Sequence, residues 1–149
     1  MDHQNILAEY EAGQRNFRGA LLEHAYLVGA VLAGADLGDA NLRGANLLEA
    51  NLSGADLRKA RLGPTNLNGI DLRTNVRDGS LEGANLENAD LEEINLVNTN
   101  LRGANLRGAN LRRALLLGAD LTNADLTGAT VTREQLAEAR STQGAKLPD

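Results

Sequence analysis

Few side chains in this sequence have the type and spacing that catalysis or metal binding requires. The 149-residue chain has two histidines, His3 and His24, and no cysteine, so any metal site would depend on two scattered imidazoles. Ser53, Ser80 and Ser141 have no histidine and acid in a fitting pattern, and no Gly-x-Ser-x-Gly elbow occurs. The glycines recur at a fixed interval rather than forming a phosphate loop. We therefore predict no catalytic residue, no metal site and no cofactor.

Carboxylate pairs such as Glu92-Glu93 are equally unpromising for acid–base chemistry. Such chemistry needs a cleft that perturbs the pKa, and the chain has no long insertion that could build one. The sequence thus predicts a protein that is not an enzyme.

Composition narrows the possible partners and compartment. The net charge is −5, with 15 basic and 20 acidic residues, which disfavours direct binding to nucleic-acid backbones. No apolar run approaches the roughly 20 residues that cross a bilayer, and the first residues lack the features of a secretory signal. We expect a cytoplasmic protein with no membrane contact and no direct nucleic-acid binding.

A five-residue repeat organises the chain, and Ala84-Asn85-Leu86-Glu87-Asn88 is one clear copy. The central apolar residue, position i, recurs every five residues from Phe17 to Leu72 and again from Val76 to Val131, which gives 24 units. Position i−2 is Ala in 17 units, position i−1 is Asn or Asp in 17, and position i+2 is Gly in 11.

Period five fits neither a helix face nor a flat strand. The chain must turn once per unit to return each Leu to the interior, and Gly at i+2 suits such turns. The small residue at i−2 leaves room for the large one at i. The sequence therefore predicts an all-β solenoid whose coils stack like parallel strands.

The motif resembles that of the pentapeptide repeat family, A(D/N)LXX, over about residues 15–133. The resemblance implies a right-handed quadrilateral β-helix of about six coils, with four units per coil. It also implies that i and i−2 point inward, while i−1, i+1 and i+2 point outward.

Opposite charges spaced 20 residues apart support a four-unit coil independently of the family. Six such pairs are predicted to stack between coils: Glu23/Arg43, Asp39/Lys59, Glu82/Arg102, Glu87/Arg107, Glu92/Arg112 and Glu93/Arg113. Each exposed pair contributes only about 0–1 kcal/mol, so their expected role is to fix the register between similar coils.

The step from Leu72 to Val76 is four residues long, which predicts a stacking offset of 19 across it. Two interpretations remain open for this step. It is either a tolerated deletion or a bend that serves recognition.

The two ends are expected to cap a single domain spanning residues 1–149, because a solenoid exposes its core and edges there. Residues 1–13 are predicted to form an N-terminal helical cap, with Asp2 as a candidate N-cap residue. Residues 15–133 form the β-helix, and residues 132–149 form a C-terminal helix and tail cap. Thr132 and Gln135 fit a capping box, and Leu147 is the expected apolar anchor of the tail.

The outward positions carry the functional hypotheses. Two apolar groups are candidate interaction surfaces unless the ends of the chain cover them: Tyr26, Val28 and Leu48, and Val97, Leu115 and Leu117. They favour a rigid interaction scaffold, monomeric or homodimeric, with an unidentified protein partner. An alternative is a DNA mimic that binds DNA gyrase or another type II topoisomerase, as some members of the resembled family do. Its candidate carboxylates are Asp36, Asp56, Asp71 and Asp90.

Overall fold

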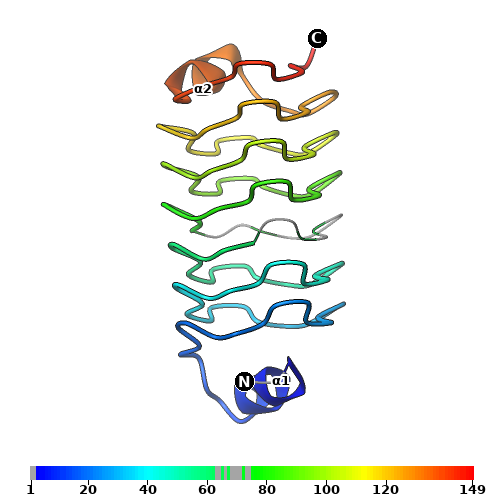
Figure 1. The fold of residues 1–149 in the computed structure, drawn as a ribbon, viewed down its shortest axis with the longest axis vertical. Coiled ribbons are helices and arrows are strands. Elements are labelled where there is room, and N and C mark those ends of the chain that lie inside the picture. The colour runs from blue at the N-terminus through cyan, green and yellow to red at the C-terminus, as the bar shows by residue number, and fades with distance from the viewer. Residues whose placement is uncertain (1–2, 63–64, 66, 68–71, 73–74) are drawn as a thin grey trace.

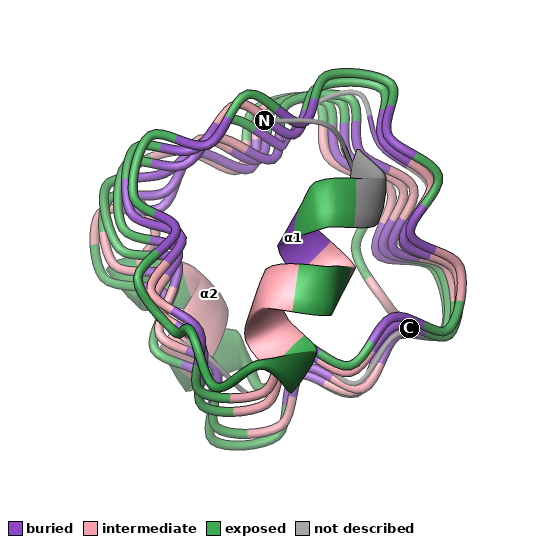
Figure 2. Cartoon of the chain, turned by 90° about the horizontal axis from the view of Figure 1, so that it is seen from below, coloured by how far each residue is buried: buried purple, intermediate pink, exposed green. Residues whose placement is uncertain are grey.

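A computed structural model describes residues 3–62, 65, 67, 72 and 75–149 of the chain. These residues form a rod of stacked coils with one helix at each end of the stack (Figure 1). Seen along the rod axis, each coil is roughly square (Figure 2). We number the four walls of the rod by their first central residues, which are Phe17, Leu22, Leu27 and Leu32.

A tight turn redirects the chain in the described units. In the unit centred on Leu22, Ala25 N–H donates to the Leu22 carbonyl at 3.0 Å, and His24 between them has a φ of 58°. The equivalent residue of the next unit is Gly29, with a φ of 66°. Positive φ at this position is the reason for its glycine preference, as the sequence predicted.

Successive coils are joined by single-residue parallel bridges at i−1. On the second wall, for example, Leu21 pairs with Asn41 and Asn41 pairs with Arg61. The 20-residue offset confirms four units per coil. Because a turn interrupts every unit, the described residues pair one at a time and form no longer strand.

The interior is filled by the i and i−2 side chains, as the repeat predicted. Leu at i and Ala at i−2 form one continuous buried cluster from Phe17 to Ala129. Thr99 takes the small-residue position in one unit, and its hydroxyl donates to the Val76 carbonyl at 2.8 Å. The core therefore runs along the whole rod without an aromatic residue except Phe17.

The four-residue step changes the offset as expected. Asp56 bridges Asn75, and Arg61 bridges Ser80, both 19 residues apart. Residues 73 and 74 within the step lie outside the described residues, so its two interpretations stay predictions.

Helix α1, His3–Glu11, lies across the N-terminal end of the stack (Figure 2). Its Ile6 is fully buried in the core cluster, and its Tyr10 hydroxyl donates to the Ala33 carbonyl of the first coil at 2.7 Å. Asp2, the candidate N-cap residue, lies outside the described residues.

Helix α2, Arg133–Glu138, begins with the predicted capping box. The Thr132 side chain accepts from Gln135 N–H at 3.1 Å, and Thr132 N–H donates to the Gln135 side chain at 2.9 Å. The capping-box prediction is thus confirmed.

The segment after α2 differs from the predicted tail. Residues 140–147 rejoin the stack, where Ser141 bridges Asp120 and Lys146 bridges Asp125. Leu147 is 47% exposed, so the expectation of a buried anchor is wrong. Ser141 extends the second wall, and Ala145-Lys146-Leu147 repeats the Ala-x-Leu pattern on the third wall. Leu147 stays exposed because it lies in the last row, where no described coil covers it.

Candidate functional site

The first wall changes character along its length. Toward the N-terminus its outward positions are charged, and toward the C-terminus they become apolar. We describe the charged part first, because it tests the carboxylate hypothesis.

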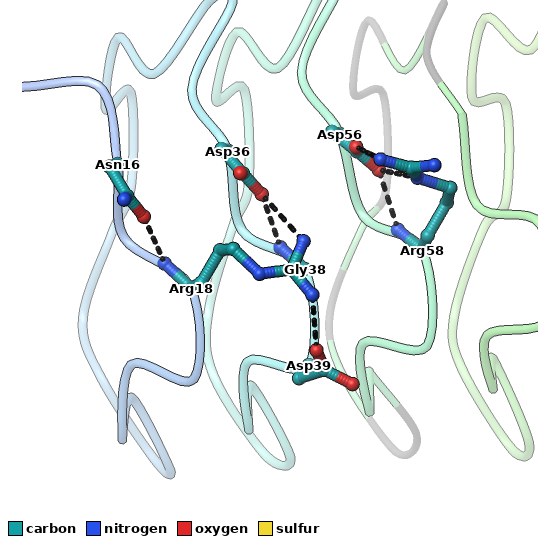
Figure 3. Close-up of polar contacts among 7 residues, drawn as sticks. All are labelled: Asn16, Arg18, Asp36, Gly38, Asp39, Asp56 and Arg58. Atoms are coloured by element: carbon teal, nitrogen blue, oxygen red, sulfur yellow. Dashed lines mark hydrogen bonds and ion pairs between the residues drawn. The ribbon is translucent and has the colours of Figure 1, made fainter.

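An ion-pair network covers the charged part of this wall (Figure 3). Arg18 reaches Asp36 in the next coil at 3.4 Å and also pairs with Asp39. Arg58 pairs with Asp56 through both its Nε and an Nη atom. The hydrogen bond from Arg58 lowers the pKa of the Asp56 carboxyl below its usual range.

Gly38 allows this arrangement. The guanidinium of Arg18 lies over Gly38, and a Cβ atom there would collide with it. Beside it is an open hollow of about 350 Å³, lined by Arg18, Arg58, Lys59, Arg77 and Asp78. Arg18, Arg58 and Arg77 each pair with a carboxylate.

The carboxylates of the mimic hypothesis stack in part but are not free. Asp36 bridges Asp56 as the spacing predicted, yet both pair with arginine. Asp90 accepts from the Asn110 side chain at 3.1 Å. Asp71 lies outside the described residues. The described residues therefore do not present the unpaired carboxylate array that a DNA mimic needs.

The predicted register pairs are mostly wrong. All twelve residues are described, and only Glu93 and Arg113 form their ion pair, at 2.9 Å. Arg113 also takes Glu92, at 2.7 Å, in place of Arg112.

Three of the observed arginine pairs have an 18-residue spacing, which the stacking of identical positions does not predict. They are Arg18/Asp36, Arg102/Asp120 and Arg107/Asp125. Positions i+1 and i−1 point to the same side of the wall, so a long side chain at i+1 reaches diagonally to i−1 of the next coil. Glu82 and Glu87 thereby lose their expected partners, and Glu82 accepts instead from the Asn100 amide at 3.2 Å. Arg43 and Lys59 likewise form no ion pair with Glu23 and Asp39 among the described residues.

The most strongly held carboxylate is Asp120, which sequence reasoning did not single out. It is 5% exposed and accepts from the Thr122 hydroxyl at 2.6 Å and the Thr122 N–H at 3.0 Å. Arg140 lies 3.0 Å away and Arg102 lies 3.5 Å away. These contacts, led by the Thr122 hydroxyl, hold the pKa of Asp120 far below its usual range. Asp120 thus fastens the row after α2 to the stack.

The C-terminal apolar patch consists of Val97, Leu115 and Leu117 on the first wall. Leu115 is 51% exposed and Leu117 is 59% exposed, while Val97 is half-buried. Helix α2 meets this wall through a bond from Gly118 N–H to the Glu138 carbonyl at 2.9 Å. The helix therefore adjoins the patch without covering it.

The N-terminal apolar patch consists of Tyr26, Val28 and Leu48 on the third wall. Tyr26 is 64% exposed, and Val28 and Leu48 are half-buried. Val31, at the start of the fourth wall, is 54% exposed. The two patches lie on different walls at opposite ends of the rod.

The residues considered for chemistry are not gathered into a site. The His24 ring packs over Gly44, and the Ser53 hydroxyl donates to the Asn51 side chain at 2.7 Å. Across the described ranges, no three His, Asp or Glu side chains are grouped so that they could hold a metal ion. No helix in those ranges has the length and apolar character to cross a membrane.

The repeat can now be compared with known sequences. The profile of a family described as Pentapeptide repeats matches in eight copies, over residues 16–37, 35–73, 80–116 and 94–133. The chain belongs to the pentapeptide repeat family. No curated protein matches it in sequence.

Solved structures of pentapeptide repeat proteins resemble the chain. One from the cyanobacterium Cyanothece 51142 is 28% identical, with 98% of this chain and 95% of that chain covered and a TM-score of 0.48. One from the thylakoid lumen of Arabidopsis thaliana is 29% identical, with 80% and 74% covered and a TM-score of 0.38.

The fluoroquinolone resistance protein QnrB1, which is plasmid-mediated, is 21% identical, with 90% and 86% covered and a TM-score of 0.39. These TM-scores are below 0.5, and the roles of these proteins do not transfer to this chain.

Proposed function

We propose that this pentapeptide repeat protein is a non-enzymatic scaffold that binds another protein molecule through its walls, with the C-terminal apolar patch as the main contact. The observation that carries the proposal is the exposure of Leu115 and Leu117 side by side, next to Val97, at the C-terminal end of a wall whose N-terminal part is charged. Contiguous exposed apolar surface of this kind is typical of interaction sites.

The proposed architecture suits this role. We take the rod to be a right-handed quadrilateral β-helix of about six coils, capped by α1 and α2, that works in the cytoplasm. The ladder of backbone bonds supports a rigid body, because bonds on all four walls hold neighbouring coils together in the described part of the chain. Rigidity favours binding, since a preorganised surface loses little freedom on association.

The test replaces the patch with the repeat's own consensus. Leu115→Asn restores the usual residue at i−1, and Leu117→Thr matches Thr122 and Thr127, which occupy the same position in the next two units. We expect the double variant to keep its fold and to lose association. The mass of the purified protein, measured by light scattering, reports self-association. Cross-linking in cells of the source organism reports association with other proteins. An unchanged assembly state and unchanged cross-linked partners in the variant would contradict the proposal.

Topoisomerase mimicry is not part of this proposal, because Asp36 and Asp56 pair with arginines. A supercoiling assay with purified gyrase provides the check. Inhibition or protection at micromolar protein would revive that alternative.

A further inference from the structure

A groove lies between α1 and the first coil, on the side of the third and fourth walls. Its volume is about 510 Å³, which is in the range of ligand clefts. It is lined by Leu7, Tyr10, Glu11, Arg15, Val28, Gly29, Ala30 and Val31.

Backbone groups at this groove lack the partners that their counterparts one coil further along the rod have. Asn51, one coil further along the fourth wall, donates its N–H to the Ala30 carbonyl at 2.8 Å and accepts from Leu32 N–H at 2.9 Å. The equivalent N–H and carbonyl of Val31 face the N-terminal end, where no coil precedes, and neither is paired within the described residues. The carbonyl of Val28 is likewise unpaired within the described residues. The equivalent carbonyl one coil further along, that of Leu48, accepts from Gly29 N–H at 2.9 Å.

Helix α1 satisfies only part of this edge. The Tyr10 hydroxyl bonds the Ala33 carbonyl, and Arg15 stacks over the Tyr10 ring at 3.7 Å. The helix therefore forms one side of the groove and, in the described part of the chain, makes no bond to the backbone groups of Val28 and Val31.

The side chains at this edge are apolar where the repeat is usually polar. Position i−1 is Leu21, Tyr26 and Val31 in three successive units, although 17 of the 24 units have Asn or Asp there. These three are 69%, 64% and 54% exposed. An apolar edge with unpaired backbone groups and no charged residue at those positions is suited to strand addition. Glu11 and Arg15 offset each other, so charge does not select the ligand.

We propose that this groove binds an extended apolar segment of a partner polypeptide, which adds to the N-terminal edge by backbone hydrogen bonds at Val31 and Val28. A helix would not fit this role, because its own backbone groups are already bonded internally. Backbone pairing supplies affinity, and alternate side chains in the groove supply selectivity. This inference deepens the scaffold function by naming the partner class at a second site, and its variants leave the C-terminal patch intact.

The experiment pans the full-length chain against a phage-displayed library of random peptides about 12 residues long. We expect enriched sequences in which apolar β-branched residues alternate with polar ones. A synthetic peptide of the enriched sequence then serves as the probe. Val31→Asp should weaken its binding by about tenfold or more, because it places a charge on the edge.

Two controls separate edge pairing from other effects. Asn51→Asp introduces the same aspartate at the equivalent position of the next coil, away from the edge. It should leave the binding affinity within about twofold of the original value. Val31→Asp itself should fold, because Asp is common at i−1. The Leu115→Asn/Leu117→Thr variant should bind the probe normally, so this inference and the proposed function fail independently.

Amide exchange identifies the bonding mode. The Val31 N–H should exchange rapidly in the free protein and slow down by about tenfold or more with the peptide, while Asn51 N–H is protected in both states. A peptide methylated at the nitrogen that faces the edge should lose binding. Enrichment of helical sequences, binding without protection of Val31, or no enriched peptide would each overturn the inference.

Discussion

The two ends of the rod are closed by different physics. At the N-terminal end the contact is apolar, since Ile6 of α1 is fully buried in the core while the edge above it stays apolar and open. At the C-terminal end α2 has no buried residue. The row that follows it is held by backbone hydrogen bonds, by the ion pair of Arg140 with the buried Asp120, and by the 2.9 Å contact between the Thr122 and Ser141 hydroxyls. The same repeat thus supports an end sealed by burial and an end fastened by a buried carboxylate.

The largest effect should come from removing the apolar contact. Ile6→Ala is expected to cost about 3 kcal/mol, because it leaves a cavity beneath α1. Leu136→Ala in α2 should cost only about 1 kcal/mol, since Leu136 is half-buried. Urea unfolding of both variants measures the difference. Equal losses would mean that the two ends are not distinct in the way described.

This asymmetry was only partly predictable from the sequence. The apolar positions of both helices, the capping box at Thr132 and the core set by Ala and Leu follow from local patterns, which act within one unit or one helical turn. The tail was expected to fold back as a cap, but its pairing with the stack as a further row was not predicted, although Ala145 and Leu147 carry the signal. A single partial unit after a helix is weak as a pattern and becomes clear only when its bridges are seen.

The charged contacts show a different limit. If identical positions of neighbouring coils stack, charged residues 20 residues apart should pair. This reasoning predicted the length of the coil correctly but most of the ion-pair partners wrongly. A long arginine side chain at i+1 can reach diagonally to a carboxylate at i−1 of the next coil, 18 residues away, as Arg102 reaches Asp120. Register is a backbone property that the repeat encodes, whereas partner choice depends on side-chain direction.

The second effect tests the carboxylate at the C-terminal end. Asp120→Asn should cost about 2 kcal/mol, because a buried charged acceptor for Arg140 and Arg102 is lost. The loss should be local, so amide exchange should speed up at Ser141 and Lys146 before it does in the inner coils. Asp125→Asn is the matched control, since Asp125 has the same threonine bond in a more exposed setting. If the control opened the row as readily as Asp120→Asn, burial of Asp120 would not be the cause.

Acid should reproduce this effect in the unmodified protein. The pKa of Asp120 is lowered in the folded state, so its stabilising contribution is complete above the unfolded value of about 3.9 and is lost as the pH falls below it. Between about pH 5 and pH 2, exchange at Ser141 should accelerate relative to inner amides. The Asp120→Asn variant should lack this part of the pH dependence, and its persistence there would assign it to another carboxylate.

Lys146→Val should have the smallest effect on stability but a clear effect on self-association. Lys146 is the only charged residue among the i−1 positions of the last row, and its ammonium lies 3.9 Å from Asp125 with the side chain largely exposed. The substitution should change the free energy of unfolding by no more than about 0.5 kcal/mol. It should nevertheless promote self-association, because it gives the C-terminal edge the apolar character that Val31 gives the N-terminal one. Sedimentation velocity in the Leu115→Asn/Leu117→Thr background measures this, with Lys146→Arg as the control that keeps the charge. If Lys146→Val sediments like Lys146→Arg, charge does not protect this edge, and the contrast between the two ends would rest on burial and on Asp120 alone.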